Sequence, residues 1–90
     1  MRIEIEIPEY HDYSGVDVFW EKNAKYKVSC YDDEVVLAAN KEGLISLAKQ
    51  MLYFAYNDLS EGSHVHFDSF FTGQSDIEHE LVLCKINNEH

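Results

Sequence analysis

The stretch that decides the fold is residues 40–59, which read NKEGLISLAKQMLYFAYNDL. Its apolar residues recur three and four residues apart, the spacing that brings side chains onto one face of an α-helix. This stripe consists of Leu44, Leu47, Ala48, Met51, Leu52, Ala55 and Leu59. Asn40 is suited to cap the first turn, because its side-chain oxygen can accept a hydrogen bond from a free backbone amide. We therefore predict an amphipathic helix after Asn40 that packs its apolar stripe on a sheet.

Two further expectations concern single positions in this helix. Gly43 costs about 1 kcal/mol relative to alanine in a helix, so we expect another part of the backbone to approach it closely. Tyr53 falls opposite the apolar stripe, together with Ser46 and Gln50, and is expected to face solvent.

Five other segments have the apolar content and alternation of β-strands. They are residues 2–7, 26–31, 34–39, 64–68 and 80–86. Residues 16–20 alternate more weakly and are a candidate for a further short strand. The predicted fold is α+β: an antiparallel sheet of about five strands with one amphipathic helix packed on one face, in the order β-β-β-α-β-β.

The alternation also predicts which side chains the sheet leaves open. In the last strand we assign Lys85 to solvent, so its neighbours two apart are expected to face the core. These inward residues are Val82, Cys84 and Ile86. The open face is then expected to carry Glu4, Glu6, Lys27, Tyr31, His64, His66, Asp68, Leu81 and Leu83.

Charge and composition limit the classes of partner. The 90 residues hold 17 Asp and Glu against 7 Lys and Arg, a formal net charge of −10. Nucleic acid and anionic membranes repel a protein of this sign, so neither is expected as a direct partner, and a basic protein is favoured. A hydrophobic content of 46% excludes a disordered acidic tail, and the short length predicts a single domain over residues 1–90.

The sequence begins without the continuous apolar run of a signal peptide, and no run approaches the roughly 20 residues that span a bilayer. We therefore expect a cytoplasmic protein. Cys30 and Cys84 lie far apart in strand-like runs and are expected to be buried, reduced thiols. A disulfide between them would need facing strands and an oxidising compartment.

The pattern His64-x-His66-x-Asp68 is the one group of residues whose types and spacing suit a chemical site such as a metal centre. Alternate residues of a strand share a face, so two imidazoles can converge on a metal ion, with Asp68, His79 or Glu80 as a third ligand. The alternatives are a polar open face whose imidazoles bond to nearby carboxylates, or a pH-sensitive contact. We favour the polar face and expect neither a bound metal nor a cofactor.

Catalysis is not favoured by the sequence. His66 and Asp68 could orient an imidazole as a catalytic triad does, but no Ser or Cys lies in a recognisable nucleophile motif. Only four glycines are present and no phosphate-binding motif occurs. We therefore expect a protein that is not an enzyme.

A surface that mixes carboxylates, imidazoles and an aromatic ring suits protein–protein contact. The predicted partner-binding residues are Glu4, Glu6, Tyr31, Tyr53, His64, His66 and Asp68. An ordinary solvated face is the alternative, and a homodimer through this face or through an edge strand is equally compatible.

Three motifs occur in order: NKEGLISLA at 40–48, GSHVHFD at 62–68 and ELVL at 80–83. Over about residues 26–86 the sequence resembles a family of small bacterial immunity proteins of polymorphic toxin systems, the immunity-protein family numbered thirty-two. It departs from that family at residues 70–76, FFTGQSD, where similar sequences carry leucine and acidic residues. The resemblance implies a stoichiometric inhibitor that binds and blocks a co-produced toxin, often a nuclease with a basic cleft.

Overall fold

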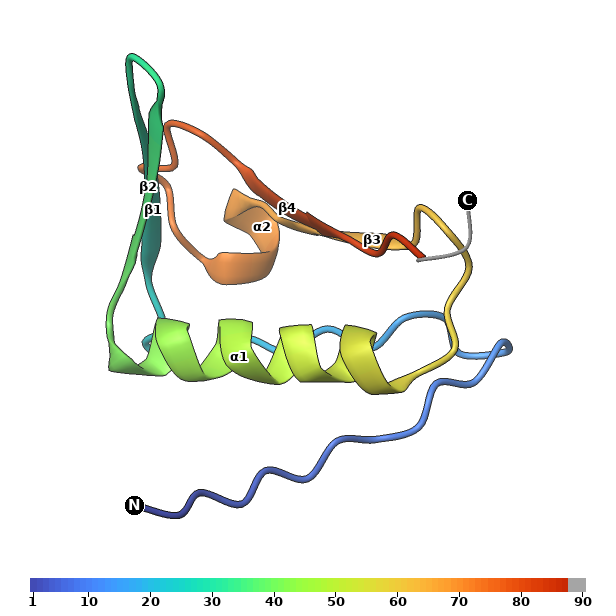
Figure 1. Ribbon diagram of the computed structural model, residues 1–90. Helices are drawn as coiled ribbons and strands as arrows, with labels where there is room; N and C mark the ends of the chain where they lie inside the picture. The colour runs from blue at the N-terminus through green and yellow to red at the C-terminus, as the bar shows by residue number, and fades with distance from the viewer. Residues whose placement is uncertain (88–90) are drawn as a thin grey trace.

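The computed structural model describes residues 1–87. It contains two β-hairpins, one long helix and one short helix, arranged around a small core (Figure 1). In chain order the elements are β1 (Tyr26–Tyr31), β2 (Glu34–Ala39), α1 (Lys41–Tyr56), β3 (His64–Phe67), α2 (Ser69–Thr72) and β4 (Leu81–Cys84).

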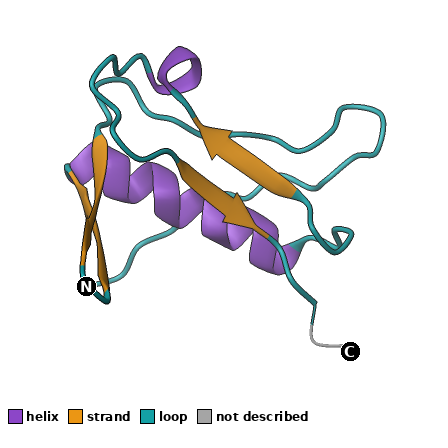
Figure 2. Ribbon diagram, turned by 90° about the horizontal axis from the view of Figure 1, so that it is seen from above, coloured by secondary structure: helices purple, strands orange, loops and turns teal. Residues whose placement is uncertain are grey.

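The four strands form two separate antiparallel pairs, β1–β2 and β3–β4. The β3–β4 pair lies over α1, and the β1–β2 pair stands at the end where α1 begins (Figures 1 and 2). The α+β class with one main helix is therefore confirmed. The expected single sheet of five strands is wrong.

Residues 2–7 are one reason why that sheet does not form. They are extended but pair with no strand of the described chain, and Ile3 is 71% exposed. The segment passes on the side of α1 away from β3–β4 (Figure 1). Alternation provides a strand with one apolar face, but a strand also needs a neighbouring edge to pair with.

The second reason is that residues 16–20 pair with a helix instead of a strand. Alternate backbone amides in and beside this segment donate to polar side chains of α1. The three bonds are Asp17 N to Tyr53 Oη (3.1 Å), Phe19 N to Gln50 Oε1 (3.0 Å) and Glu21 N to Ser46 Oγ (2.8 Å). The Gln50 amide also donates to the carbonyl of Asp17, at 2.9 Å. The segment thus satisfies its backbone on α1 and has no need of a ladder.

These bonds fix which face of α1 is inside. Ser46, Gln50 and Tyr53 are fully buried, whereas Leu44 and Met51 of the expected apolar stripe are exposed. The expectation that Tyr53 faces solvent is therefore wrong. The free-energy cost of burying these polar side chains is offset because each has a hydrogen-bond partner in the segment that covers it.

The start of α1 confirms both expectations made there. The side chain of Asn40 accepts from Gly43 N at 2.9 Å and from Lys25 N at 2.9 Å. A Cβ added to Gly43 would overlap the carbonyl oxygen of Lys25. The glycine is therefore explained by the strand-to-helix crossing, where the backbone of residue 25 lies against the first turn.

Tyr26 joins the two hairpins. Its hydroxyl donates to the carbonyl of Phe67 in β3 at 2.5 Å and accepts from the amide of Leu81 in β4 at 3.1 Å. Its ring meets the Trp20 ring edge-on, with 5.8 Å between the ring centroids, and the Trp20 and Phe67 ring centroids are 5.4 Å apart. Ring packing and two backbone contacts thus connect β1 to β3 and β4.

The predicted orientation of the last strand is inverted. Leu81 and Leu83 are half-buried against the core, and Val82 and Cys84 are exposed. The reason is Lys85, whose ammonium turns inward and donates to carbonyls near the end of α1. Those carbonyls are Phe54 O, at 2.5 Å, and Asn57 O, at 3.4 Å.

Both cysteines, Cys30 and Cys84, are free and exposed, so their expected burial is wrong. Within residues 1–87, neither helix has the length and apolar content needed to cross a membrane.

Candidate functional site

The outward side of the β3–β4 hairpin gathers the chemically distinctive residues. His64 lies opposite Cys84 and His66 opposite Val82 in the strand register, so these four side chains share one face. Glu80, just before β4, reaches His66 on the same side. We call these five residues the histidine face. All five are exposed.

Both imidazoles of the histidine face are held in place. His66 Nδ1 lies 2.6 Å from Glu80 Oε1, and His64 Nδ1 lies 2.9 Å from the carbonyl oxygen of Gly62. The two rings are 5.0 Å apart and nearly perpendicular. An exposed pair such as His66–Glu80 contributes at most about 1 kcal/mol to stability, so its effect is to orient the side chains.

Asp68 does not join the two histidines. Its carboxylate accepts from Phe71 N at 2.8 Å and so caps α2. Within residues 1–87, no three His, Cys, Asp or Glu side chains come together in a way that could hold a metal ion. The pattern His64-x-His66-x-Asp68 is therefore a strand followed by a helix cap, in which Asp68 has a structural role.

Helix α2 holds one aromatic side chain out to solvent. Phe70 is 97% exposed, while its neighbour Phe71 packs on Trp20 with 6.3 Å between the two ring centroids. On the far side of α2, Gln74 bonds to both backbone groups of Tyr26, at 2.8 and 2.9 Å. The connection is thus anchored on both sides of Phe70, which projects from a fixed base.

The acidic charge is concentrated in the stretch of sequence that runs from the second half of α1 to the end of β4. Residues 50–84 contain no Lys or Arg and six carboxylates, a formal charge of −6 out of −10 for the whole chain. The six are Asp58, Glu61, Asp68, Asp76, Glu78 and Glu80. A stretch of this length without a basic residue is a sequence signal that site prediction from strand alternation misses.

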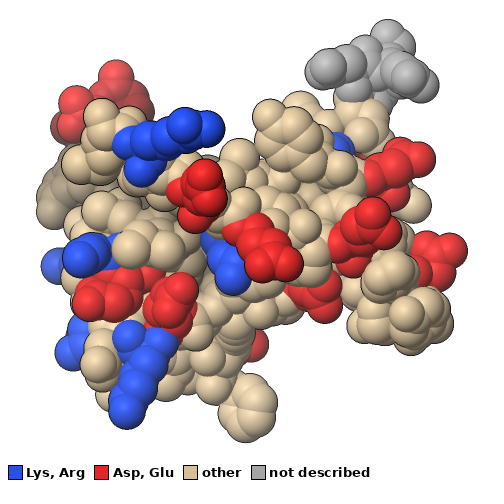
Figure 3. Space-filling model, turned by 90° about the horizontal axis from the view of Figure 1, so that it is seen from below, with Lys and Arg blue, Asp and Glu red and all other residues tan. Residues whose placement is uncertain are grey.

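Basic residues lie elsewhere. Most of the Lys and Arg side chains visible in Figure 3 gather toward the end of the molecule where α1 begins. In the sequence, four lysines precede or start that helix: Lys22, Lys25, Lys27 and Lys41. The molecule therefore carries its charge asymmetrically along its length.

The other predicted partner-binding residues do not share a surface with the histidine face. Glu4 and Glu6 are exposed on the segment beyond α1, Tyr31 is exposed at the end of β1, and Tyr53 is buried. The single open face expected from strand alternation is therefore wrong. Two hairpins and an unpaired segment place these residues on separate parts of the molecule.

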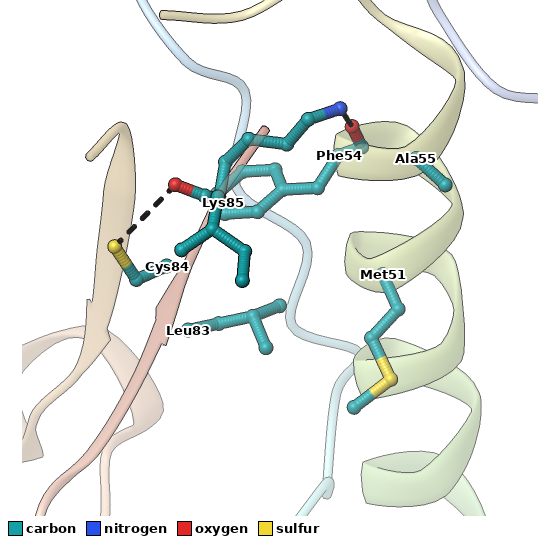
Figure 4. Close-up of a pocket in the computed structure, with 7 residues that line it drawn as sticks. Met51, Phe54, Ala55, Leu83, Cys84 and Lys85 are labelled. Carbon is teal, nitrogen blue, oxygen red and sulfur yellow. Dashed lines mark hydrogen bonds between the residues drawn. The ribbon is translucent and has the colours of Figure 1, made fainter. Parts of the chain in front are cut away.

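A groove of about 340 Å³ lies between α1 and β4 (Figure 4). Its lining is apolar, with Met51 and Phe54 on one side and Leu83 and Ile86 on the other. Among the described residues that line it, the Lys85 ammonium is already bonded to α1, and the free thiol of Cys84 points away from the helix (Figure 4). The size and apolar lining of the groove suit an apolar side chain.

Comparison with known protein families identifies the family to which the chain is similar. A family model described as Immunity protein 32 matches residues 34–86, which run from β2 to just past β4. No curated protein and no solved structure matches the chain. The matched range covers more than half of the sequence and contains the whole histidine face and Phe70.

Proposed function

The chain belongs to the immunity protein 32 family, and we propose that it neutralises a cognate bacterial toxin by binding it stoichiometrically in the cytoplasm. The proposed contact surface is the histidine face together with Phe70 and the acidic connection around it. The observation that carries this choice is an exposed aromatic ring in a stretch with six carboxylates and no basic residue.

The charge favours a toxin with a basic surface. A concentrated negative field steers a positive partner and raises its association rate by about 10- to 1,000-fold at low salt. Toxins that act on nucleic acids carry such surfaces in order to hold phosphates. An acidic inhibitor can occupy that cleft in place of the phosphate backbone.

Phe70 is the proposed anchor. Its ring stands in solvent on a helix that Asp68 caps and that Phe71 packs against Phe67 of the core, so little backbone freedom is lost on binding. Aromatic side chains at the centre of an interface often account for about 2 kcal/mol or more of binding energy. The two histidines and Glu80 would form the polar part of the contact surface.

The first experiment is co-expression with the toxin encoded beside this protein. We expect the toxin alone to kill the host and the pair to be tolerated. A harmless neighbour, or equal killing with and without this chain, would contradict the proposal.

The second experiment locates the surface. Phe70→Ala should weaken toxin binding about 30-fold, which corresponds to about 2 kcal/mol. Tyr56→Ala is the matched control, because Tyr56 is 80% exposed but lies on α1. Equal affinities for the two variants would place the contact elsewhere on the molecule.

A further inference from the structure

We propose that two copies of this chain associate by strand exchange, with residues 2–7 of each copy adding to the edge of β2 in the other. The surfaces involved lie outside the proposed toxin contact, so this inference does not depend on the proposed function. Four observations support it: an unpaired segment, an uncovered edge, a distance that prevents pairing within one chain, and matching side-chain patterns.

The unpaired segment is residues 2–7. Ile3, Ile5 and Ile7 alternate with Arg2, Glu4 and Glu6, and the backbone is extended. Among residues 1–87, no backbone group of this segment has a hydrogen-bond partner. The segment therefore has the form of a strand and lacks only an edge.

The uncovered edge is β2. Three consecutive apolar residues of this strand, Val35, Val36 and Leu37, are exposed, and Val35 is 73% exposed. The other edge of the same hairpin is partly closed, because Gln74 bonds to both backbone groups of Tyr26. An apolar strand edge open to water is an association surface unless something covers it.

Distance excludes pairing within one chain. Asn57, just after α1, bonds to Pro8 O at 3.2 Å and Tyr10 N at 2.8 Å, which fixes the segment at that end of the helix. β2 joins the opposite end of α1, and 16 helical residues span about 24 Å. Six extended residues span about 20 Å, which is shorter than the helix. Residues 2–7 therefore cannot cross from Pro8 to β2 and also lie alongside its edge, and they run on the other side of α1 (Figure 1).

The side-chain patterns of the two elements match. In the β1–β2 register Leu37 lies opposite Val28, on the side that faces the core, whereas Ala38 lies opposite Lys27 on the outer side. Ile5 placed opposite Leu37 continues the apolar side in either strand direction. The Glu4 and Glu6 carboxylates then fall on the same side as the Lys27 ammonium, which is charge complementarity.

Exchange between copies is reciprocal. Each copy donates one segment and receives one, which gives a closed two-fold dimer with no edge of β2 left over. Two chains of charge −10 repel each other, so we expect association to strengthen with salt as the repulsion is screened.

The first test is the mass of the full chain in solution, measured by size exclusion with light scattering from micromolar to millimolar concentration. We expect a species of twice 10.5 kDa, and Ile5→Lys should reduce it to the monomer while leaving the circular dichroism spectrum unchanged. A monomer at every concentration, in low and high salt, would overturn the proposal.

The second test does not depend on Ile5→Lys folding well. In a Cys30→Ser, Cys84→Ser background, chains with Ile5→Cys are mixed with chains carrying Leu37→Cys and oxidised. We expect a disulfide between the two kinds of chain. Val36→Cys in place of Leu37→Cys is the matched control, because its side chain points to the opposite side of the strand and should not cross-link. Equal cross-linking of both pairs, or of neither, would reject the strand pairing.

Discussion

Gly43 sets the distance between α1 and the chain that precedes β1. A side chain there would overlap the Lys25 carbonyl, which is itself held by a hydrogen bond from Asn40 N at 3.1 Å. Gly43→Ala gains up to about 1 kcal/mol of helix propensity, but displacing the carbonyl costs more. We expect a net loss of about 1–2 kcal/mol in the free energy of unfolding, measured in urea by the fluorescence of Trp20.

The control for Gly43→Ala is Ala48→Gly, which reverses the change at an exposed position of the same helix. It should lose about 1 kcal/mol through propensity alone. If Gly43→Ala instead stabilises the protein, the close crossing of the backbone is not present in solution.

Tyr26 predicts how stability depends on pH. Burial raises the pKa of its phenol above the ordinary value of 10.0, and the carboxylates of Glu80 and Asp68 raise it further against a lowering by the bond from Leu81 N. The folded state therefore keeps the proton longer than the unfolded state does. Stability from this group is complete below pH 10 and is lost as the pH rises through the raised pKa.

Urea unfolding at several values between pH 8 and pH 12 tests this expectation. Tyr26→Phe should be less stable at pH 8, because Phe67 O and Leu81 N lose their partner, by about 1–3 kcal/mol. Its stability should also fall less steeply above pH 10 than that of the unaltered chain. Parallel curves for the two proteins would show that Tyr26 does not carry the dependence.

At the scale of one element, α1 is defined by side chains that bond to a distant segment. Gln50→Leu keeps the size of the side chain but leaves Phe19 N and Asp17 O without their partner, and we expect a loss of about 2–4 kcal/mol. Met51→Gln, one residue on, should change stability by less than about 0.5 kcal/mol because Met51 is exposed. Urea unfolding of the two variants checks which face of α1 is buried. A larger loss of stability for Met51→Gln than for Gln50→Leu would support the face predicted from periodicity instead.

Local signals in the sequence are sufficient to predict where most helices and strands occur. The hairpin strands at 26–31 and 34–39, the cap at Asn40 and the helix after it all lie where expected, because alternation, a turn and a capping residue act within a few residues. The side on which a helix is buried is a different matter. It depends on residues 17–21, which meet α1 only in the folded chain.

The same limit applies to the candidate site. His64 and His66 point outward as the period of their strand predicts. Asp68 was expected beside them, but the chain turns into α2 there and the carboxylate becomes a cap. Lys85, one residue beyond β4, is predicted to face solvent because of its charge, whereas it donates to carbonyls at the end of α1 and the strand has the opposite orientation.

For the whole molecule, salt should have opposite effects on folding and on toxin binding. The chain carries 17 Asp and Glu residues against 7 Lys and Arg, so screening the repulsion among carboxylates should raise the midpoint of thermal unfolding as NaCl is added. Asp76→Asn with Glu78→Gln should reduce this response, since both side chains are exposed. A midpoint that falls with NaCl would contradict the expectation.

Association with a basic toxin should instead slow as salt is added. We expect the association rate to fall about 10-fold or more between low and physiological ionic strength, with the dissociation rate nearly unchanged. Stopped-flow or surface-based kinetics measure both rates. The variant with Asp76→Asn and Glu78→Gln should show a smaller fall, whereas an association rate independent of salt would remove electrostatic steering from the mechanism.

The way Tyr26 holds the second hairpin bears on how such a protein can change its target. The hydroxyl contacts only the backbone of Phe67 and Leu81, atoms that every residue type provides. These two hydrogen bonds therefore hold the ends of residues 68–80 whatever side chains stand at 67 and 81, whereas inside the segment Asp68, Phe71 and Gln74 are fixed by contacts of their own side chains. The exposed positions of the segment, Phe70 among them, can therefore change by mutation while these anchoring contacts persist, so new specificities can arise without a new fold.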